Sequence, residues 1–584
     1  MKKLLYLFVV AVTIYCVGCN THSKESSKNS DATFKKFEDV FLDSYWKQYP
    51  TASIYIGYGK YYDKLVVPDS NAVANNISFS KQWLDSLNKL DFNALTDNDK
   101  ISFNIIKNQL ESDNWYQSVF KQYEWDASSY NLSGECYYLI NQPWAGLDDR
   151  LKTLSSHIDN STAYYKAAFH LLNRPTKEHL ELAILQNKGG LSVFGKSLTD
   201  SINASHLSDS EKNILIQNAA KTVIAINEYI ASLNGMLSNK TLEFRSFAIG
   251  KELFTQKFKY DIAADITPEE LYTKATIAKK EYDTKMYTLA GNLWAKYYKT
   301  ENKPTDTAAL IAGVINKIQL QHAMPEHFFD TLSNQVHQLK KFIIEKDLFD
   351  FDTTYPIVVR YMPDYASGVT IANAEFTPPY QKHGITYYNV DDLTKYSKDK
   401  AESALQEVNN YMSQLLSIHE AMPGHCLQGI YSNKKSPDVL RSVFQNGAMI
   451  EGWAVYTEGM MLDNGWGNHS PELELIHYKM KLRELSNVII DYDMQVLNKP
   501  KDYIMHILIN ECFQTKAQAE EKYHRATVSQ VQLCYYYAGY SAIAALRDAY
   551  QQKMGDKYSL KAFHESFLSY GSSPVKYISE RMLQ

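Results

Sequence analysis

The segment HEAMPGH at residues 419–425 combines side chains that bind metals with side chains that move protons. Two imidazoles and one carboxylate form the ligand set of a catalytic zinc site, which keeps one further position open for water. A second acidic cluster, with Glu451 and Glu458, follows closely. Glu420, next to His419, has the type and position of a general base. The segment therefore points to metal-dependent hydrolysis.

The spacing of the two histidines requires a break in the helix. In a straight helix six residues turn the chain by roughly 600°, so the rings of His419 and His425 would point about 120° apart. Proline disfavours a helix interior and glycine permits unusual dihedral angles, so Pro423-Gly424 can return His425 to the side of His419. Spacing alone leaves an alternative open, in which the helix ends at Met422, His419 is a satisfied polar residue and His425 is a loop residue.

The HEAMPGH segment resembles the signature of the DUF885 family, large bacterial proteins grouped with glutamate-type zinc metallopeptidases. Further segments that resemble family motifs lie in order along the C-terminal half. They are Gly384 with 387–389, the EGWAVYTEG block at 451–459, Arg525, Gln532, Tyr536 and Gly539, and 563–568 with Gly571 and Pro574. The resemblance is specific from about residue 360 to the C-terminus.

The resemblance implies a zinc ion as cofactor and a role for each motif residue. His419 and His425 would bind zinc as neutral imidazoles, and Glu451 would be the third ligand. Glu420 would be the general base, taking a proton from the attacking water and passing it to the leaving amine. Glu458 lies seven residues after Glu451 and, on a helix, shares its face. It is a candidate to hydrogen-bond a ligand histidine, with a solvated surface position as the alternative.

A tyrosine hydroxyl aimed at the tetrahedral intermediate would stabilise its negative charge. Tyr536 is the candidate, with Tyr388 and Tyr535 as alternates. Arg525 offers a fork of donors for a peptide carboxylate, or else forms a structural salt bridge. The predicted substrate-binding residues are Tyr388, Asn389, Arg525 and Gln532.

Two segments depart from the family pattern. The family often has Asp-Thr-Gly-x-His where this chain has Asp491-Tyr492-Asp493-Met494-Gln495, and Pro-Gly where this chain has Gln530-Val531. The metal motif is intact, so these departures bear on substrate preference more than on catalysis.

The first residues have the pattern of a secretory signal. Lys2 and Lys3 precede an apolar run that is shorter than the roughly 20 residues of a membrane-spanning helix. The run ends at Val17-Gly18-Cys19, which resembles a bacterial lipobox, although Cys16 stands where leucine is usual. We therefore predict a signal peptide at 1–18, lipidation of Cys19 and a polar tether at 19–32. The expected location is the bacterial cell envelope, lipid-anchored outside the cytoplasm, with a periplasmic or secreted protein as the alternative.

Composition excludes some classes of function. The net charge is −5 over 584 residues, and no basic block stands out, so nucleic acid is not an expected partner. Beyond the signal region four cysteines remain, Cys136, Cys426, Cys512 and Cys534. Four cysteines in a chain of this length do not form a disulfide framework, although one bridge is compatible with an oxidising compartment.

The pattern predicts a mainly α fold with a small β element. Capping signals start helices at Ser208 and Thr267, and helical spacing covers 406–418 and 538–553. Strands are predicted at 356–361 and 384–390. We expect residues 33–350 to form a helical scaffold and 351–584 the catalytic part, together a large zinc-peptidase-like body around a deep cleft.

The function predicted from these features is zinc-dependent hydrolysis of oligopeptides by a secreted or membrane-anchored protein. One alternative is a zinc hydrolase of a non-peptide amide, because the same site chemistry serves both. The other is a non-catalytic binding lipoprotein, against which the intact Glu420 argues.

Overall fold

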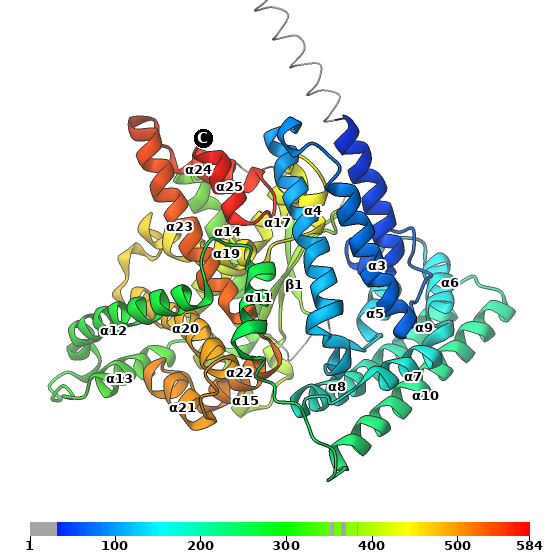
Figure 1. The fold of residues 1–584 in the computed structure, drawn as a ribbon. Coiled ribbons are helices and arrows are strands. Elements are labelled where there is room, and N and C mark those ends of the chain that lie inside the picture. Colours follow the sequence, from blue (N-terminus) through cyan, green and yellow to red (C-terminus); the bar gives the residue numbers. More distant parts are fainter. Residues whose placement is uncertain (1–31, 351, 353–354, 364–369, 382–383) are drawn as a thin grey trace, which may run out of the picture.

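The computed structural model describes residues 32–350, 352, 355–363, 370–381 and 384–584. The helices of residues 32–238, blue to blue-green in Figure 1, lie on one side of the molecule. The helices of residues 268–319 lie on the other side with most helices of the C-terminal half, and strand β1 is between the two sides. The predicted signal peptide, Cys19 and nearly all of the predicted tether lie outside the described residues.

The N-terminal half is built from helices joined by short turns. Residues 32–48 are helical. The helices that follow are α2 (Pro50–Tyr55), α3 (Ser70–Leu87), α4 (Asp97–Trp115), α5 (Ser133–Asn141), α6 (Leu147–His157), α7 (Ser161–Leu171), α8 (Lys177–Gly190), α9 (Lys196–Ala204), α10 (Asp209–Ser238), α11 (Gly250–Ile262), α12 (Pro268–Tyr298), α13 (Thr307–Gln319) and α14 (Pro325–Glu345). The capping boxes predicted at Ser208 and Thr267 are both present and begin α10 and α12.

The C-terminal half combines helices with one small sheet. Its helices are α15 (Lys398–Glu407), α16 (Met412–Glu420), α17 (His425–Lys435), α18 (Leu440–Val443), α19 (Gly447–Asp463), α20 (Pro471–Gln495), α21 (Lys501–His506), α22 (Lys516–Val528), α23 (Tyr535–Met554), α24 (Leu560–Ser569) and α25 (Val575–Met582). The mainly α fold is thus confirmed, while the deep cleft stays a prediction. Within the described residues, no helix is long and apolar enough to cross a membrane.

The helix predicted at 406–418 begins later than expected. The chain turns after α15, and the side chain of Asn409 accepts hydrogen bonds from the backbone nitrogens of Tyr411 (3.1 Å) and Met412 (3.2 Å). An asparagine in this position satisfies the free N–H groups at a helix start. Asn409 therefore ends one helix and begins α16, which carries His419.

The sheet has the strand order β1-β3-β2 and lies beside α16 and α17. β1 (Ile357–Tyr361) and β3 (Thr386–Val390) are the two predicted strands and pair in parallel. β2 (Ala372–Glu375) pairs antiparallel with β3 and was not predicted. Its four residues, Ala-Asn-Ala-Glu, include none of the β-branched or aromatic types that mark strands. β2 forms an edge of this sheet.

The buried hydrophobic residues form three clusters. One lies within residues 54–233, and one joins residues 34–110 to Leu440 and Phe444. The third combines residues 115–125 and α11–α14 with the C-terminal half. Helices α11–α14 therefore share a core with the metal motif. The predicted division near residue 350 stays a prediction.

Candidate metal centre

The helix breaks between the two histidines. α16 ends at Glu420 and α17 begins at His425, with a cis peptide bond between Met422 and Pro423. The backbone nitrogen of Gly424 donates to the carbonyl oxygen of Ile418 at 2.9 Å. A Cβ atom at position 424 would lie 1.8 Å from the carbonyl oxygen of His419, so only glycine fits this turn. The predicted break is confirmed, and the alternative with His425 in a loop is wrong.

The break and helix α19 bring the three predicted ligands together. Oε2 of Glu451 lies 3.8 Å from Nε2 of His419 and 3.6 Å from Nε2 of His425. The candidate ligand atoms of all three residues lie within 4.8 Å of one another. Zinc binds such atoms at about 2.0–2.2 Å, so tetrahedral ligands stand roughly 3.3–3.6 Å apart. The two carboxylate–imidazole distances lie at or slightly above this range, and two imidazoles with one carboxylate are a donor set that zinc takes.

Glu458 fixes the orientation of His419. Its Oε1 lies 2.7 Å from Nδ1 of His419, so the contact predicted for Glu458 is present. A histidine that donates through Nδ1 presents Nε2 to a metal. Burial opposes the charged form of His419, but hydrogen bonds to Glu451 and Glu458 raise its pKa well above the ordinary value. Metal binding must then displace a proton from this ring.

A buried lysine stands behind Glu458. Nζ of Lys481 contacts the carbonyl oxygen of Val455 (3.2 Å) and Oε2 of Glu484 (3.1 Å), and it lies 4.1 Å from the ring centre of Tyr540. Burial raises the pKa of Glu458, yet its hydrogen bond to His419 and the charge of Lys481 hold that pKa below the ordinary value. Burial raises the pKa of Glu484 to about 8. Lys481 therefore favours the carboxylate form of Glu458, which is the form that accepts from His419.

His425 is held by its own helix. Its Nδ1 lies 3.4 Å from Oε1 of Gln428, one turn further along α17. The ring of Phe376 approaches edge-on, with 6.4 Å between the ring centres. Apart from Glu451, the polar partner of His419 comes from another helix, whereas the polar partner of His425 comes from its own.

Glu420 points toward β2. Its Oε2 accepts a hydrogen bond from the backbone nitrogen of Ala374 at 3.1 Å. Because β2 pairs with β3 along its other side, this N–H belongs to the outer edge of the strand. The candidate general base thus lies between the ligand His419 and the edge of the sheet.

Three of the predicted residues form a separate group. Nη2 of Arg525 donates to Oε1 of Gln532 (2.7 Å) and to the hydroxyl of Tyr536 (3.2 Å). Tyr536 lies on α23, three residues before Gly539, whose backbone meets Gly452 of α19. None of the contacts recorded among the described residues joins Tyr536 to the three ligands, so its role in stabilising an oxyanion stays a prediction.

The two predicted substrate residues on β3 are buried. Tyr388 is fully buried, with its hydroxyl 3.4 Å from Oγ of Ser417. Asn389 accepts from Nε of Arg360 at 2.7 Å and donates to Oδ1 of Asn373 at 2.9 Å. Tyr388 thus joins β3 to α16, and Asn389 joins the strands of the sheet. Their roles in substrate binding stay predictions.

Sequence reasoning missed Gln428, Ala374 and Lys481. Gln428 was detectable, since it follows His425 by three residues and α17 places it on the same side. Ala374 and Lys481 carry no local signal, because they contact the site only through the folded chain. The four described cysteines are free and buried.

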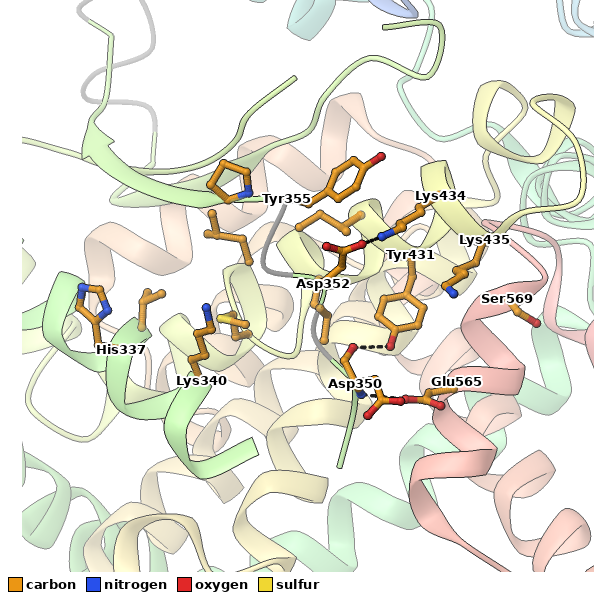
Figure 2. A pocket seen from close by; sticks show the side chains of 16 residues that line it. His337, Lys340, Asp350, Asp352, Tyr355, Tyr431, Lys434, Lys435, Glu565 and Ser569 are labelled. Carbon is orange, nitrogen blue, oxygen red and sulfur yellow. Dashed lines mark hydrogen bonds and ion pairs between the residues drawn. The ribbon is translucent and has the colours of Figure 1, made fainter. Parts of the chain in front are cut away.

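A cavity borders the motif region (Figure 2). It has a volume of about 640 Å³ and is lined by side chains from α14, α17 and α24. Met422 and Leu427 of the motif region face it. Lysines and carboxylates both line it, with an ion pair between Lys434 and Asp352. None of His419, Glu420, His425 and Glu451 belongs to its lining, so this cavity is separate from the metal centre.

Comparison with known proteins gives one family and several similar structures. A lipoprotein structure from Shewanella oneidensis, described as "a putative lipoprotein of unknown function", has 41% sequence identity and a TM-score of 0.85, covering 94% of this chain and 100% of that chain. A "putative lipoprotein" from Colwellia psychrerythraea has 14% identity and a TM-score of 0.76, covering 95% and 98%, and shows a similar fold. A comparison with curated proteins finds no match. The profile "Bacterial protein of unknown function (DUF885)" matches residues 50–582, nearly the whole chain, which therefore belongs to the DUF885 family.

Proposed function

We propose that this protein is a zinc-dependent peptidase of the cell envelope that hydrolyses oligopeptides. The observation that carries the proposal is the convergence of His419, His425 and Glu451, with Glu420 beside a ligand. A site that only bound metal for stability would have no use for an additional carboxylate next to the ligands.

Each side chain has a defined part in the reaction. His419, His425 and Glu451 would hold the zinc, which when bound activates a water molecule and polarises the substrate carbonyl. Glu420, oriented by the Ala374 backbone, takes a proton from the attacking water and delivers it to the leaving amine. Glu458 holds the His419 ring so that Nε2 faces the other ligands.

The proposed location is the outside of the cytoplasmic membrane, with a lipid anchor at Cys19. Its support is the lipobox-like sequence, together with the descriptions of the two similar structures as lipoproteins. A tethered enzyme with this chemistry would meet peptides in the periplasm or at the cell surface.

The test is digestion of a mixed peptide library by the zinc-loaded full chain, with products identified by mass spectrometry. The wild type should cleave, and Glu420→Gln should lose nearly all cleavage while keeping its zinc. Glu326→Gln, an exposed glutamate on α14, is the matched control and should cleave like the wild type. If zinc is bound and neither the wild type nor the control cleaves any peptide, the proposal fails in favour of another amide substrate or a binding role.

A further inference from the structure

A second cavity, of about 230 Å³, borders the His425 side of the metal centre. Three of its lining residues touch the surroundings of the site. Phe376 meets the ring of His425 edge-on, Gln428 contacts Nδ1 of His425, and Ile450 directly precedes Glu451. The cavity therefore adjoins two predicted ligands: its lining contacts His425 and includes the residue before Glu451.

The floor of this cavity is made of small, mutually satisfied side chains. Oγ of the buried Ser432 lies 3.3 Å from Oγ of Ser442 and 3.2 Å from Oγ of Ser572. Ser442 also donates to the carbonyl oxygen of Ser432 at 3.0 Å. These hydroxyls bond to one another and to the backbone. A ligand in the cavity therefore does not have to supply a polar group to satisfy them.

The walls are neutral. Phe376, Val443 and Ile450 supply apolar surface, and Tyr55 and Ile56 close the cavity from the N-terminal half. Among the described residues, none that lines it is Asp, Glu, Lys, Arg or His. The 640 Å³ cavity differs in this respect, since its lining includes three lysines, two aspartates and a glutamate.

We infer that this cavity is a substrate subsite that selects an uncharged, chiefly apolar side chain of the peptide. The inference rests on the proposed function and names the substrate class of that site. A charged side chain entering a cavity with no opposite charge would lose its hydration without compensation. The volume is below the roughly 300–1,000 Å³ of pockets that take whole small ligands, and suits a single side chain.

The position of β2 explains how a substrate would reach the subsite. The outer edge of β2 meets Glu420 at Ala374, and the chain continues through Phe376 into the cavity wall. Two residues of extended chain span roughly 6.6 Å. A peptide held with its scissile bond at Glu420 and running along this edge places a side chain one or two residues away into the cavity.

The first experiment measures the rate at which the protein cleaves peptides that differ at one position at a time. For one position near the scissile bond, we expect leucine, methionine or phenylalanine to exceed lysine and aspartate in kcat/KM by at least roughly tenfold. Zinc content is measured for every protein sample, which separates an effect on the subsite from damage to the metal centre.

Two variants change the cavity in defined ways. Gln445→Glu adds a negative charge at the exposed rim and should raise cleavage of lysine peptides at that one position. Gly429→Ala places a Cβ atom 2.5 Å from Cδ1 of Phe376, which pushes the ring into the cavity and should shift preference to smaller side chains. The matched controls are Gln217→Glu, exposed on α10, and Gly235→Ala, where a Cβ atom meets nothing within 4 Å. Both controls should retain the wild-type preference.

The outcomes are distinguishable. Zinc-loaded protein that cleaves no peptide overturns the proposed function and this inference with it. Cleavage without selection against charge at any position, or selection that neither cavity variant alters, overturns the subsite alone and leaves the peptidase assignment standing.

Discussion

Two fully buried carboxylates on neighbouring helices have pKa values shifted in opposite directions. Glu458 of α19 accepts from His419 and has the ammonium group of Lys481 nearby, and its pKa lies below the ordinary value despite burial. Asp491 of α20 has the thiol of Cys534 at 3.6 Å, and burial raises its pKa to about 8. Burial acts in the same direction on both groups, so the difference lies in their partners.

Of these two acids, Glu458 contacts the candidate metal centre, through His419. Glu458 stays charged because a histidine and a lysine compensate for the lost hydration. Asp491 lies in the segment that departs from the family pattern, and near neutral pH it is mostly protonated. At the end of that segment, where the family often has histidine, Gln495 accepts from Ile249 N (3.3 Å) and donates to Ala526 O (2.9 Å). This departure therefore has a structural role in the core.

Replacing a ligand should have the largest effect. Glu451→Gln removes the negative charge from between the two histidines, so zinc affinity should fall by more than the roughly tenfold loss typical of a supporting residue. Zinc content by elemental analysis, with circular dichroism to confirm folding, measures this. Unchanged zinc occupancy in a folded variant would remove Glu451 from the site.

Replacing Glu458 should have the next largest effect, and replacing Asp491 should have none on zinc affinity. Glu458→Gln should lower zinc affinity by roughly 10- to 100-fold, because an amide holds the His419 ring less well. Asp491→Asn, the matched change at the other buried acid, should leave zinc affinity unchanged. Competition with a chelator of known affinity measures both. Equal losses in the two variants would contradict the division between the two regions.

Two buried lysines on α20 provide a finer test. Lys481→Met removes the charge that stabilises the Glu458 carboxylate, and we expect a loss of zinc affinity smaller than that of Glu458→Gln. Lys479 is also buried, and burial lowers its pKa to about 8, but no ion pair is recorded for it among the described residues. Lys479→Met should bind zinc like the wild type in the same competition assay. A loss at Lys479 equal to that at Lys481 would assign the effect to general packing.

The smallest expected effect is a pH dependence of stability. The pKa of Asp491 is raised in the folded protein, so the protonated side chain contributes to the free energy of unfolding. This contribution is fully present below about pH 4 and is lost as the pH rises through about 8. Asp491→Asn does not titrate. The melting temperature of this variant relative to the wild type should therefore increase between pH 6 and pH 9. A difference that is constant with pH would contradict the raised pKa.

Local sequence signals predicted much of the fold. Ser208 and Thr267 marked helix starts because a capping box satisfies free backbone groups within one turn. The strands at 357–361 and 386–390 were predicted because β-branched and aromatic residues cluster there. β2 was missed because its residues have no strand preference. Its pairing with β3 becomes visible only in the folded chain.

The sequence by itself determined the candidate ligand set and the break that brings its two histidines together. Pro423-Gly424 is a local feature, and glycine is required at 424 by atoms only five and six residues earlier in the chain. The tertiary structure decided which groups support the candidate ligands and the candidate base. Lys481 reaches Val455 across 26 residues of sequence, and Ala374 reaches Glu420 across 46. Charge compensation and strand edges act through space, and no spacing along the chain encodes them.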